Sequence, residues 1–379
     1  MSLRIRALTV AIPYDPVELL EASKRKDVLR KLSSLKDRTK SIQPPVWTLR
    51  VVTKPIETER LVNYNIPSLF VSLDAIRTEL GFDYLAIPIL LSSSISANDL
   101  ACSRRAVNAL KAKEGLFLSL NIGSFELEDM PRIAGFYSSL LFSLRKDRDY
   151  ATQTRISLVL KGPLMTPYFP SGASLSDEFS IMVALLYSNF LLGSIRSRIP
   201  LHEAVRRAYH LTASPVSKLA EALGMDFAGI DLSISPWMDE SVINLLKALR
   251  RDNELTEPTL SSILRVNHLL ETLSSEVKSL GFNEIMLPLA EDNGLKDLVQ
   301  KGVLRIRDFI ALSMVCVAGV DMVPLPKGTL GFIKGLVNEI LSVALIKPKP
   351  MGIRLIATDE EPGVLVSLGR FPETPIPLI

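Results

Sequence analysis

The sequence GIDLSISP at residues 229–236 returns with small changes in three other places, as GFDYLAIP (81–88), GFNEIMLP (281–288) and GVDMVPLP (319–326). Each copy has a glycine, an apolar residue, an Asp or Asn, a mostly apolar run and a proline. Glycine is favoured just beyond the end of a helix, and proline ends a strand because it cannot donate to the ladder. A strand without polar alternation is buried on both faces. We therefore predict that each copy leads from a helix into a buried strand and ends where that strand ends.

The third position of the pattern is always polar, with Asp83, Asp231, Asn283 and Asp321 in the four copies. At the start of a strand, a short polar side chain can bond nearby backbone groups. In parallel α/β sheets and barrels, ligands gather where the strands end. We therefore predict structural roles for these four side chains and expect the chemistry to lie beside and after the prolines.

Strand-like runs occupy the whole chain and are mostly separated by segments with helical periodicity. This alternation predicts βα units and a largely parallel sheet. A long helical stretch at about 175–223 separates two groups of five strands, so we expect one α/β domain over 1–379 with halves at about 1–174 and 224–379. The ten predicted strands are 3–12, 46–53, 82–88, 116–122, 155–161, 228–235, 283–288, 319–325, 352–357 and 364–368.

Composition limits the class of protein. The 379 residues are 47% hydrophobic, enough for a sizeable core, and the net charge of +3 gives no overall field for nucleic acid or anionic lipid. The most apolar window, 181–195, is shorter than the roughly 20 residues of a membrane span, and we predict a buried helix there. Two cysteines and no signal peptide predict a cytoplasmic protein. The three glutamines, beside many Arg, Lys and Pro, suggest a thermophilic source.

One local segment is strongly basic. Residues 24–40 (KRKDVLRKLSSLKDRTK) carry eight Lys or Arg against two Asp, with an apolar stripe at helical spacing. Such a segment can contact RNA or an acidic partner. No aromatic residue interleaves the charges, so we favour an outer helix with a solvated basic face and expect no nucleic-acid partner.

Six blocks of the sequence resemble successive blocks of one family, domain-of-unknown-function family 711, which is described as pyruvate-formate-lyase-like. The resemblance implies a ten-stranded α/β barrel of the glycyl-radical-enzyme type with two five-stranded halves, and it implies no established activity. The blocks are RIRALTVAI (4–12), LSLNIGS (118–124), GMDFAGIDLSISP (224–236), LPLAEDNGL (287–295), VCVAGVDMVPLP (315–326) and IRLIAT (353–358).

The chain departs from this family where members are usually rich in glycine, at 181–193, at 254–262 and in SLGRFPETP (367–375). Glycyl-radical chemistry needs a radical glycine in an Arg-Val-x-Gly-Tyr-like setting, but Gly369 is not followed by a tyrosine. Cys102 and Cys316 fall in apolar helical segments, which favours packing. We therefore expect no radical catalysis and no cofactor. His202, His210 and His268 show no metal-ligand spacing, so we expect no metal site.

Polar residues at the predicted strand exits are the candidate site. Glu291 and Asp292 are the candidate bases, since no histidine competes for the role. Thr329 can cap a helix from Leu330 whose free N–H groups, with Lys327, suit an anion. The alternatives are a loop and helix-start pair for the two acids and a capped helix with a solvated lysine. The other candidate ligand-binding residues are Asn121, Ser124, Lys161, Ser233, Ser235 and Arg354.

Two functions therefore remain open at this point. The first is a protein that binds or turns over a small anionic metabolite at the strand ends without radical chemistry. The second is a degenerate, non-catalytic barrel that acts through homo-oligomer or protein-partner contacts. The missing glycines favour the second, whereas the retained blocks NIGS (121–124), AEDNG (290–294) and GVDM (319–322) favour the first. We predict the first, with Glu291 and Lys327 facing each other across one mouth.

Overall fold

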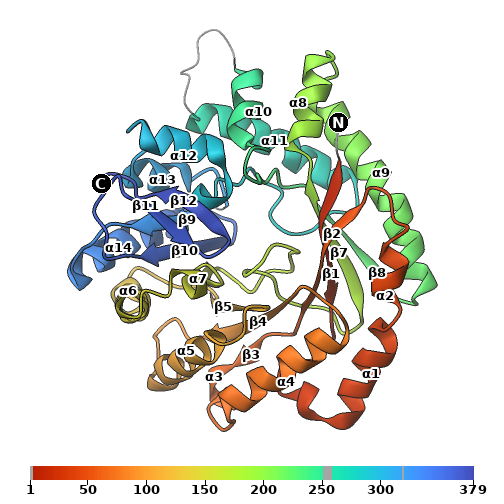
Figure 1. Ribbon diagram of the computed structural model, residues 1–379, viewed down its shortest axis with the longest axis horizontal. Helices are drawn as coiled ribbons and strands as arrows, with labels where there is room; N and C mark the ends of the chain where they lie inside the picture. The colour runs from red at the N-terminus through yellow and green to blue at the C-terminus, as the bar shows by residue number, and fades with distance from the viewer. Residues whose placement is uncertain (1–2, 251–257, 318–319) are drawn as a thin grey trace.

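The computed structural model describes residues 3–250, 258–317 and 320–379 and shows a mixed α/β fold around one ten-stranded, mostly parallel sheet (Figure 1). The order of strands along the sheet is β8-β7-β1-β2-β4-β5-β6-β10-β9, and β3 pairs with β4 beside this path. Its strands are β1 (Arg4–Ala11), β2 (Val46–Val52), β3 (Ile56–Glu57), β4 (Tyr84–Leu91), β5 (Leu116–Ile122), β6 (Ile156–Leu160), β7 (Ser180–Leu186), β8 (Asp226–Asp231), β9 (Asp321–Leu325) and β10 (Met351–Ala357).

Strand direction divides the sheet into two groups. β1, β2, β4, β5 and β6 are parallel to one another. β7 is antiparallel to β1, and β10 is antiparallel to β6. β8 and β9 are parallel to β7 and β10 respectively. The second group therefore runs opposite to the first, and the exits of the two groups lie at opposite ends of the sheet. We predicted that several exit residues would surround one cavity, and strand direction allows this only for exits that belong to the same group.

Helices surround the sheet on its outer side (Figure 1). The basic segment 24–40 forms α1 and α2, which bury Val28, Leu32 and Leu35. The α-helices are α1 (Ala22–Leu32), α2 (Leu35–Thr39), α3 (Thr58–Leu61), α4 (Ile66–Glu79), α5 (Ala97–Leu110), α6 (Met130–Lys146), α7 (Tyr150–Gln153), α8 (Ser188–Arg196), α9 (Leu201–Ala222), α10 (Val242–Leu249), α11 (Leu260–Glu276), α12 (Asn293–Gln300), α13 (Ile306–Leu312) and α14 (Leu330–Ile346). Two 3₁₀ helices are η1 (Glu18–Leu20) and η2 (Leu289–Glu291).

Three predicted elements need correction. The buried helix predicted at 181–195 is strand β7 followed by α8. All residues of β7 are buried, so this run has neither helical nor strand periodicity. The predicted strand 283–288 makes only an isolated bridge to the segment after β8, at Ile234 and Ile285. The predicted strand 364–368 is β11 (Leu365–Leu368), which forms a separate hairpin with β12 (Phe371–Pro375).

The repeated pattern behaves largely as predicted, but not in every copy. Gly81 and Gly281 have φ of +67° and +81°, a region that favours glycine. Asp83 and Asn283 accept hydrogen bonds from backbone N–H groups of neighbouring segments. Gly229, however, lies within β8, so Asp231 ends this strand and does not begin it. Gly319 and residues 254–257 of the glycine-poor block at 254–262 lie outside the described residues.

The segment between β6 and β7 fills the inside of the curved sheet. Tyr168 packs against Ala7 of β1 and Phe282, whereas Phe169 packs against Phe117 of β5. A hydrogen bond from Thr166 to Asp231 ties this segment to the end of β8, with 2.9 Å between Oγ1 and Oδ2. The segment thus carries aromatic side chains to the place where β1, β2 and β10 face one another.

Candidate functional site

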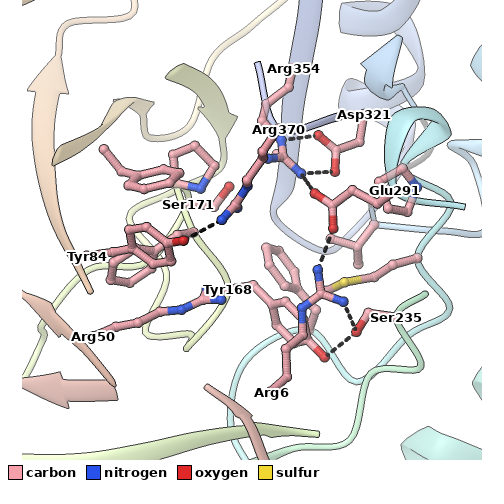
Figure 2. Close-up of a pocket in the computed structure, with 18 residues that line it drawn as sticks. Arg6, Arg50, Tyr84, Tyr168, Ser171, Ser235, Glu291, Asp321, Arg354 and Arg370 are labelled. Atoms are coloured by element: carbon pink, nitrogen blue, oxygen red, sulfur yellow. Dashed lines mark hydrogen bonds and ion pairs between the residues drawn. The ribbon is translucent and has the colours of Figure 1, made fainter. Parts of the chain in front are cut away.

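A cavity of about 50 Å³ lies inside the sheet and is lined by four arginines and two carboxylates (Figure 2). β1, β2 and β10 contribute Arg6, Arg50 and Arg354, and the turn of the β11–β12 hairpin contributes Arg370. The carboxylates are Glu291, which ends η2, and Asp321, which begins β9. Charged side chains are rarely buried unless they are paired, so the cluster marks this end of the sheet as a candidate site.

Two of the arginines are paired with the two carboxylates. Arg354 donates to both oxygens of Asp321, with 2.6 Å between Nη2 and Oδ2. The same Nη2 lies 3.2 Å from Oε1 of Glu291, whose other oxygen accepts from Arg6. Burial raises the pKa of Glu291, but the charges of Arg6 and Arg354 outweigh burial and hold it below its usual value. Glu291 is therefore an ionised link between β1 and β10.

Arg50 is also buried, with 7% of its surface exposed, but it has no carboxylate partner among the described residues. Its Nε donates to Thr48 Oγ1 at 3.0 Å and its Nη1 lies 3.4 Å from the Pro167 carbonyl. Its guanidinium packs against the rings of Tyr84 and Phe169. Burial and the charge of Arg6 lower the pKa of Arg50 to about 9. The side chain is thus still charged at neutral pH, although no carboxylate among the described residues is in contact with it.

Arg370 closes the cavity from the hairpin. Its Nη1 donates to the Tyr84 hydroxyl, and its guanidinium packs against the rings of Trp237 and Phe371. It is exposed and makes no ion pair with a carboxylate anywhere in the described ranges. The cavity is thus lined by four arginines and two carboxylates, and the two excess positive charges are those of Arg50 and Arg370.

Hydrogen bonds of hydroxyl groups hold the side chains around Arg6 in place. The Tyr168 hydroxyl lies 3.2 Å from Ser235 Oγ, and Arg6 Nη1 lies at the same distance from this oxygen. Tyr168 also donates to the carbonyl of Ser233. Burial raises the pKa of Tyr168. The phenol is therefore neutral at neutral pH, and it orients Ser235 and Arg6 without adding a charge.

A second, larger cavity of about 570 Å³ adjoins the first. The two cavities share Tyr84, Phe117, Arg354 and Arg370 as lining residues. We call the larger one the vestibule. It is lined further by Arg77 of α4, the turn 111–115 after α5, α7 with its adjoining residues and the β11–β12 hairpin. Because these four residues line both cavities, a group bound in the vestibule would lie next to the inner cavity.

Three of the predicted site residues, Glu291, Ser235 and Arg354, line the inner cavity together. Asp292 does not, because its carboxylate caps α12 and accepts from the backbone N–H groups of Gly294 and Val242. Burial raises the pKa of Asp292 to about 6. Its position agrees with the helix-start alternative, whereas Glu291 faces the arginines.

The other predicted residues do not line the inner cavity. Ser233 donates to Asp231 Oδ1 at 2.6 Å. Lys327 is exposed, and Thr329 Oγ1 accepts from Phe332 N at the start of α14, which agrees with the alternative of a capped helix with a solvated lysine. Asn121, Ser124 and Lys161 lie at or near the carboxyl ends of β5 and β6, the opposite end of the sheet.

Sequence reasoning missed Arg6, Arg50, Tyr84 and Arg370, and it assigned Asp321 a purely structural role. Arg6 and Arg50 interrupt buried strand runs, and a charge within such a run is itself a signal of a paired or functional group. Tyr84 and Asp321 begin their strands. They were overlooked because we expected ligands only where strands end. Arg370 follows Gly369, the glycine considered for radical chemistry.

Cysteine and histidine contribute nothing to this cavity. Cys102 and Cys316 are both buried, and burial raises the pKa of each thiol. His202, His210 and His268 lie on the exposed surfaces of α9 and α11. Within the described ranges, no group of three His, Cys, Asp or Glu side chains could hold a metal ion. In the same ranges, every helix is too short or too polar to cross a membrane.

The fold and the cavity define a class: mixed α/β proteins with a buried arginine–carboxylate cluster inside a curved, mostly parallel sheet. The chain belongs to the family described as "Uncharacterised ACR (DUF711)", whose model matches residues 2–368. It is 23% identical over 350 residues to a UPF0210 protein of Methanospirillum hungatei, covering 86% of this chain and 77% of that one. A UPF0210 protein of Lachnospira eligens is 22% identical over 349 residues, with the same coverage.

Proposed function

We propose that this protein binds a compact dianion, a phosphate or phosphomonoester group, in the inner cavity. The observation that carries the proposal is Arg50, a buried guanidinium without a carboxylate partner beside the equally unpaired Arg370. An isolated buried charge is costly and is normally paired. Arginine is suited to phosphate because its planar fork donates two parallel hydrogen bonds.

The size of the cavity favours one compact group over two separate carboxylates. A water needs roughly 10–15 Å³ of such space, so a cavity of about 50 Å³ has room for a few waters or one tetrahedral anion. Glu291 and Asp321 hold Arg6 and Arg354 in place, which leaves the charges of Arg50 and Arg370 for the ligand. A dianion balances those two charges.

Turnover at this site would need a general base. Of the two predicted bases, only Glu291 lines the inner cavity. A general base works best when its pKa lies near the working pH. The lowered pKa of Glu291 makes it a weak proton acceptor. We therefore propose binding as the primary function and Glu291 as the residue that positions Arg6 and Arg354.

We also propose that the sheet closes into a ten-stranded barrel that forms one domain, with the segment 279–288 completing the wall between β8 and β9. Parallel bridges from Ile230 to Ser279 and from Ile234 to Ile285 support this closure. The two halves would each have five strands: β1, β2, β4, β5 and β6 in one, and β7, β8, 279–288, β9 and β10 in the other. The antiparallel pairs β1–β7 and β6–β10 would then lie between the two halves.

The test of phosphate binding uses thermal unfolding of the full chain in a phosphate-free buffer with added orthophosphate. At 100 times its dissociation constant, orthophosphate should stabilise the wild type by about 2.7 kcal/mol. Arg50→Met should remove this stabilisation. Arg25→Gln, which removes an exposed partner of Glu79, is the control and should keep it. If orthophosphate and sulfate leave the wild-type midpoint unchanged, anion binding is refuted and the partner-contact function becomes the better conclusion.

A further inference from the structure

We propose that the bound phosphate is the head group of a polyhydroxylated ligand, such as a sugar phosphate, whose body occupies the vestibule. This inference rests on the proposed function, because it needs the phosphate in the inner cavity. It adds the chemical class of the whole ligand. The two cavities share Tyr84, Phe117, Arg354 and Arg370, so an ester oxygen leaving the inner cavity would enter the vestibule directly.

The volumes of the two cavities divide such a ligand into a head and a body. The inner cavity of about 50 Å³ cannot hold more than the phosphate itself. The vestibule has about 570 Å³, which falls in the usual range of roughly 300–1,000 Å³ for small-molecule sites. Whatever is esterified to the phosphate must therefore lie in the vestibule, against the turn after α5, α7 and the hairpin.

The unoccupied polar groups of the vestibule are mainly acceptors. Glu114 is exposed and has no hydrogen-bond or ion-pair partner among the described residues. Asp83 uses one carboxylate oxygen, which accepts from Leu49 N at 2.8 Å. Free carboxylate oxygens accept hydrogen bonds from hydroxyl groups. A ligand body with several hydroxyls can satisfy both side chains at once.

The basic residues of the vestibule are already engaged. Lys111 lies 2.5 Å from Asp147 Oδ2, and Arg77 pairs with Asp74 at 2.8 Å. Arg155 donates to backbone carbonyls of the turn after α5. Because Lys111 and Arg77 are neutralised by these partners, the cation that disfavours an ammonium close to the phosphate is Arg370, which lines both cavities without a carboxylate partner among the described residues. A neutral body with hydroxyls meets no such penalty.

The vestibule also has an apolar surface. The rings of Tyr84 and Phe117 pack edge to face at 5.1 Å, and Phe371 lines the same space. Aromatic faces offer a flat contact for C–H groups, while their polar neighbours bind the hydroxyls. The lining carries at least six ionisable side chains, which disfavours a long alkyl chain. The combination of carboxylates and rings fits a sugar better than either an alkyl or an aminoalkyl body.

The experiment is isothermal titration calorimetry of the full chain with four probes: orthophosphate, glucose 6-phosphate, n-hexyl phosphate and 2-aminoethyl phosphate. We expect glucose 6-phosphate to bind at least about tenfold more tightly than n-hexyl phosphate, as two added hydrogen bonds would give. Asp83→Asn combined with Glu114→Ala should remove most of this difference and leave the affinity for orthophosphate within about twofold. Glu128→Ala, at an exposed carboxylate outside both cavities, should change neither affinity.

The outcomes separate the two proposals. If orthophosphate binds but n-hexyl phosphate binds as tightly as glucose 6-phosphate, the polyhydroxylated body is refuted and the phosphate site stands. A clear preference for 2-aminoethyl phosphate overturns the proposal of a polyhydroxylated body in favour of a body with an ammonium group. The inference also fails if the double variant binds glucose 6-phosphate as the wild type does. If no probe binds, the phosphate site itself is refuted.

Discussion

Glu291 and Arg354 lie 63 residues apart in the chain, and Glu291 Oε1 accepts from Arg354 Nη2 at 3.2 Å inside the curved sheet. The second oxygen of Glu291 accepts from Arg6, so one carboxylate joins β1 to β10. These strands belong to the two groups that run in opposite directions. The site is therefore assembled by the curvature of the sheet and not by consecutive βα units.

We expect Glu291→Gln to lower the free energy of unfolding by about 3 kcal/mol, because breaking a buried ion pair leaves charges without compensation. Arg6 and Arg354 would both lose a counter-charge, so added orthophosphate should stabilise this variant more than it stabilises the wild type. Denaturant unfolding with and without orthophosphate measures both effects. Glu79→Gln, which removes an exposed pair with Arg25, is the control and should cost less than about 1 kcal/mol.

Arg50→Met should have the opposite effect on stability. The substitution removes a buried, unpaired charge and keeps an apolar chain against Tyr84 and Phe169. In phosphate-free buffer we expect the variant to be more stable than the wild type by about 1 kcal/mol, as happens when a residue kept for function is replaced. Excess orthophosphate should reverse this order. A variant that is less stable than the wild type in phosphate-free buffer would mean that Arg50 is a structural residue.

Part of the fold could be predicted from the sequence, because helices alternate with runs of buried apolar residues. The run 181–186 was misassigned, since a strand paired on both sides and buried on both faces has no polar residue to reveal its period. That error hid β7, whose antiparallel pairing with β1 reverses the direction of the second group.

The candidate site was harder to predict, because strand direction decides which residues meet. Asn121 lies near the end of β5, whereas Glu291 follows the predicted strand 283–288 and contacts β1 and β10 near the other end of the sheet. Only a pairing of strands distant in sequence brings Arg6 near Glu291, and a single sequence does not contain that information. The charges within the buried strands β1 and β2 were visible, and they were the better signal.

Asp292 should make stability depend on pH in a specific direction. Its pKa is raised from 3.8 to about 6 in the folded chain, so folding favours its protonated form. Its contribution to stability is complete below about pH 4 and is lost as the pH rises through 6, a change of roughly 3 kcal/mol at 1.36 kcal/mol per pKa unit. Asp292→Asn keeps an acceptor for the N–H groups of α12 and should remove this loss. Denaturant unfolding of both proteins at pH 4.5 and 8 should capture about 2 kcal/mol of this change, and parallel pH profiles would contradict the prediction.

Gly281 lies where the repeated pattern is most constrained, with φ of +81° and its α-carbon against the carboxylate of Asp231. A β-carbon at this position would lie 2.1 Å from Asp231 Oδ2, an oxygen that accepts from Thr166 Oγ1 and Phe282 N. Gly281→Ala must therefore adopt a strained backbone, at roughly 1–2 kcal/mol, and also displace a buried, hydrogen-bonded carboxylate.

Gly363→Ala is the matched control, because its φ of +85° is nearly the same but no atom lies within 4 Å of the added carbon. We expect Gly281→Ala to lower the free energy of unfolding by at least about 2 kcal/mol more than Gly363→Ala does, the typical cost of leaving a buried polar group without its partners. Because Asp231 also holds Thr166 and the aromatic segment beside the inner cavity, Gly281→Ala should weaken orthophosphate binding, whereas Gly363→Ala should not. Equal losses in the two variants would show that only the backbone conformation requires glycine at 281.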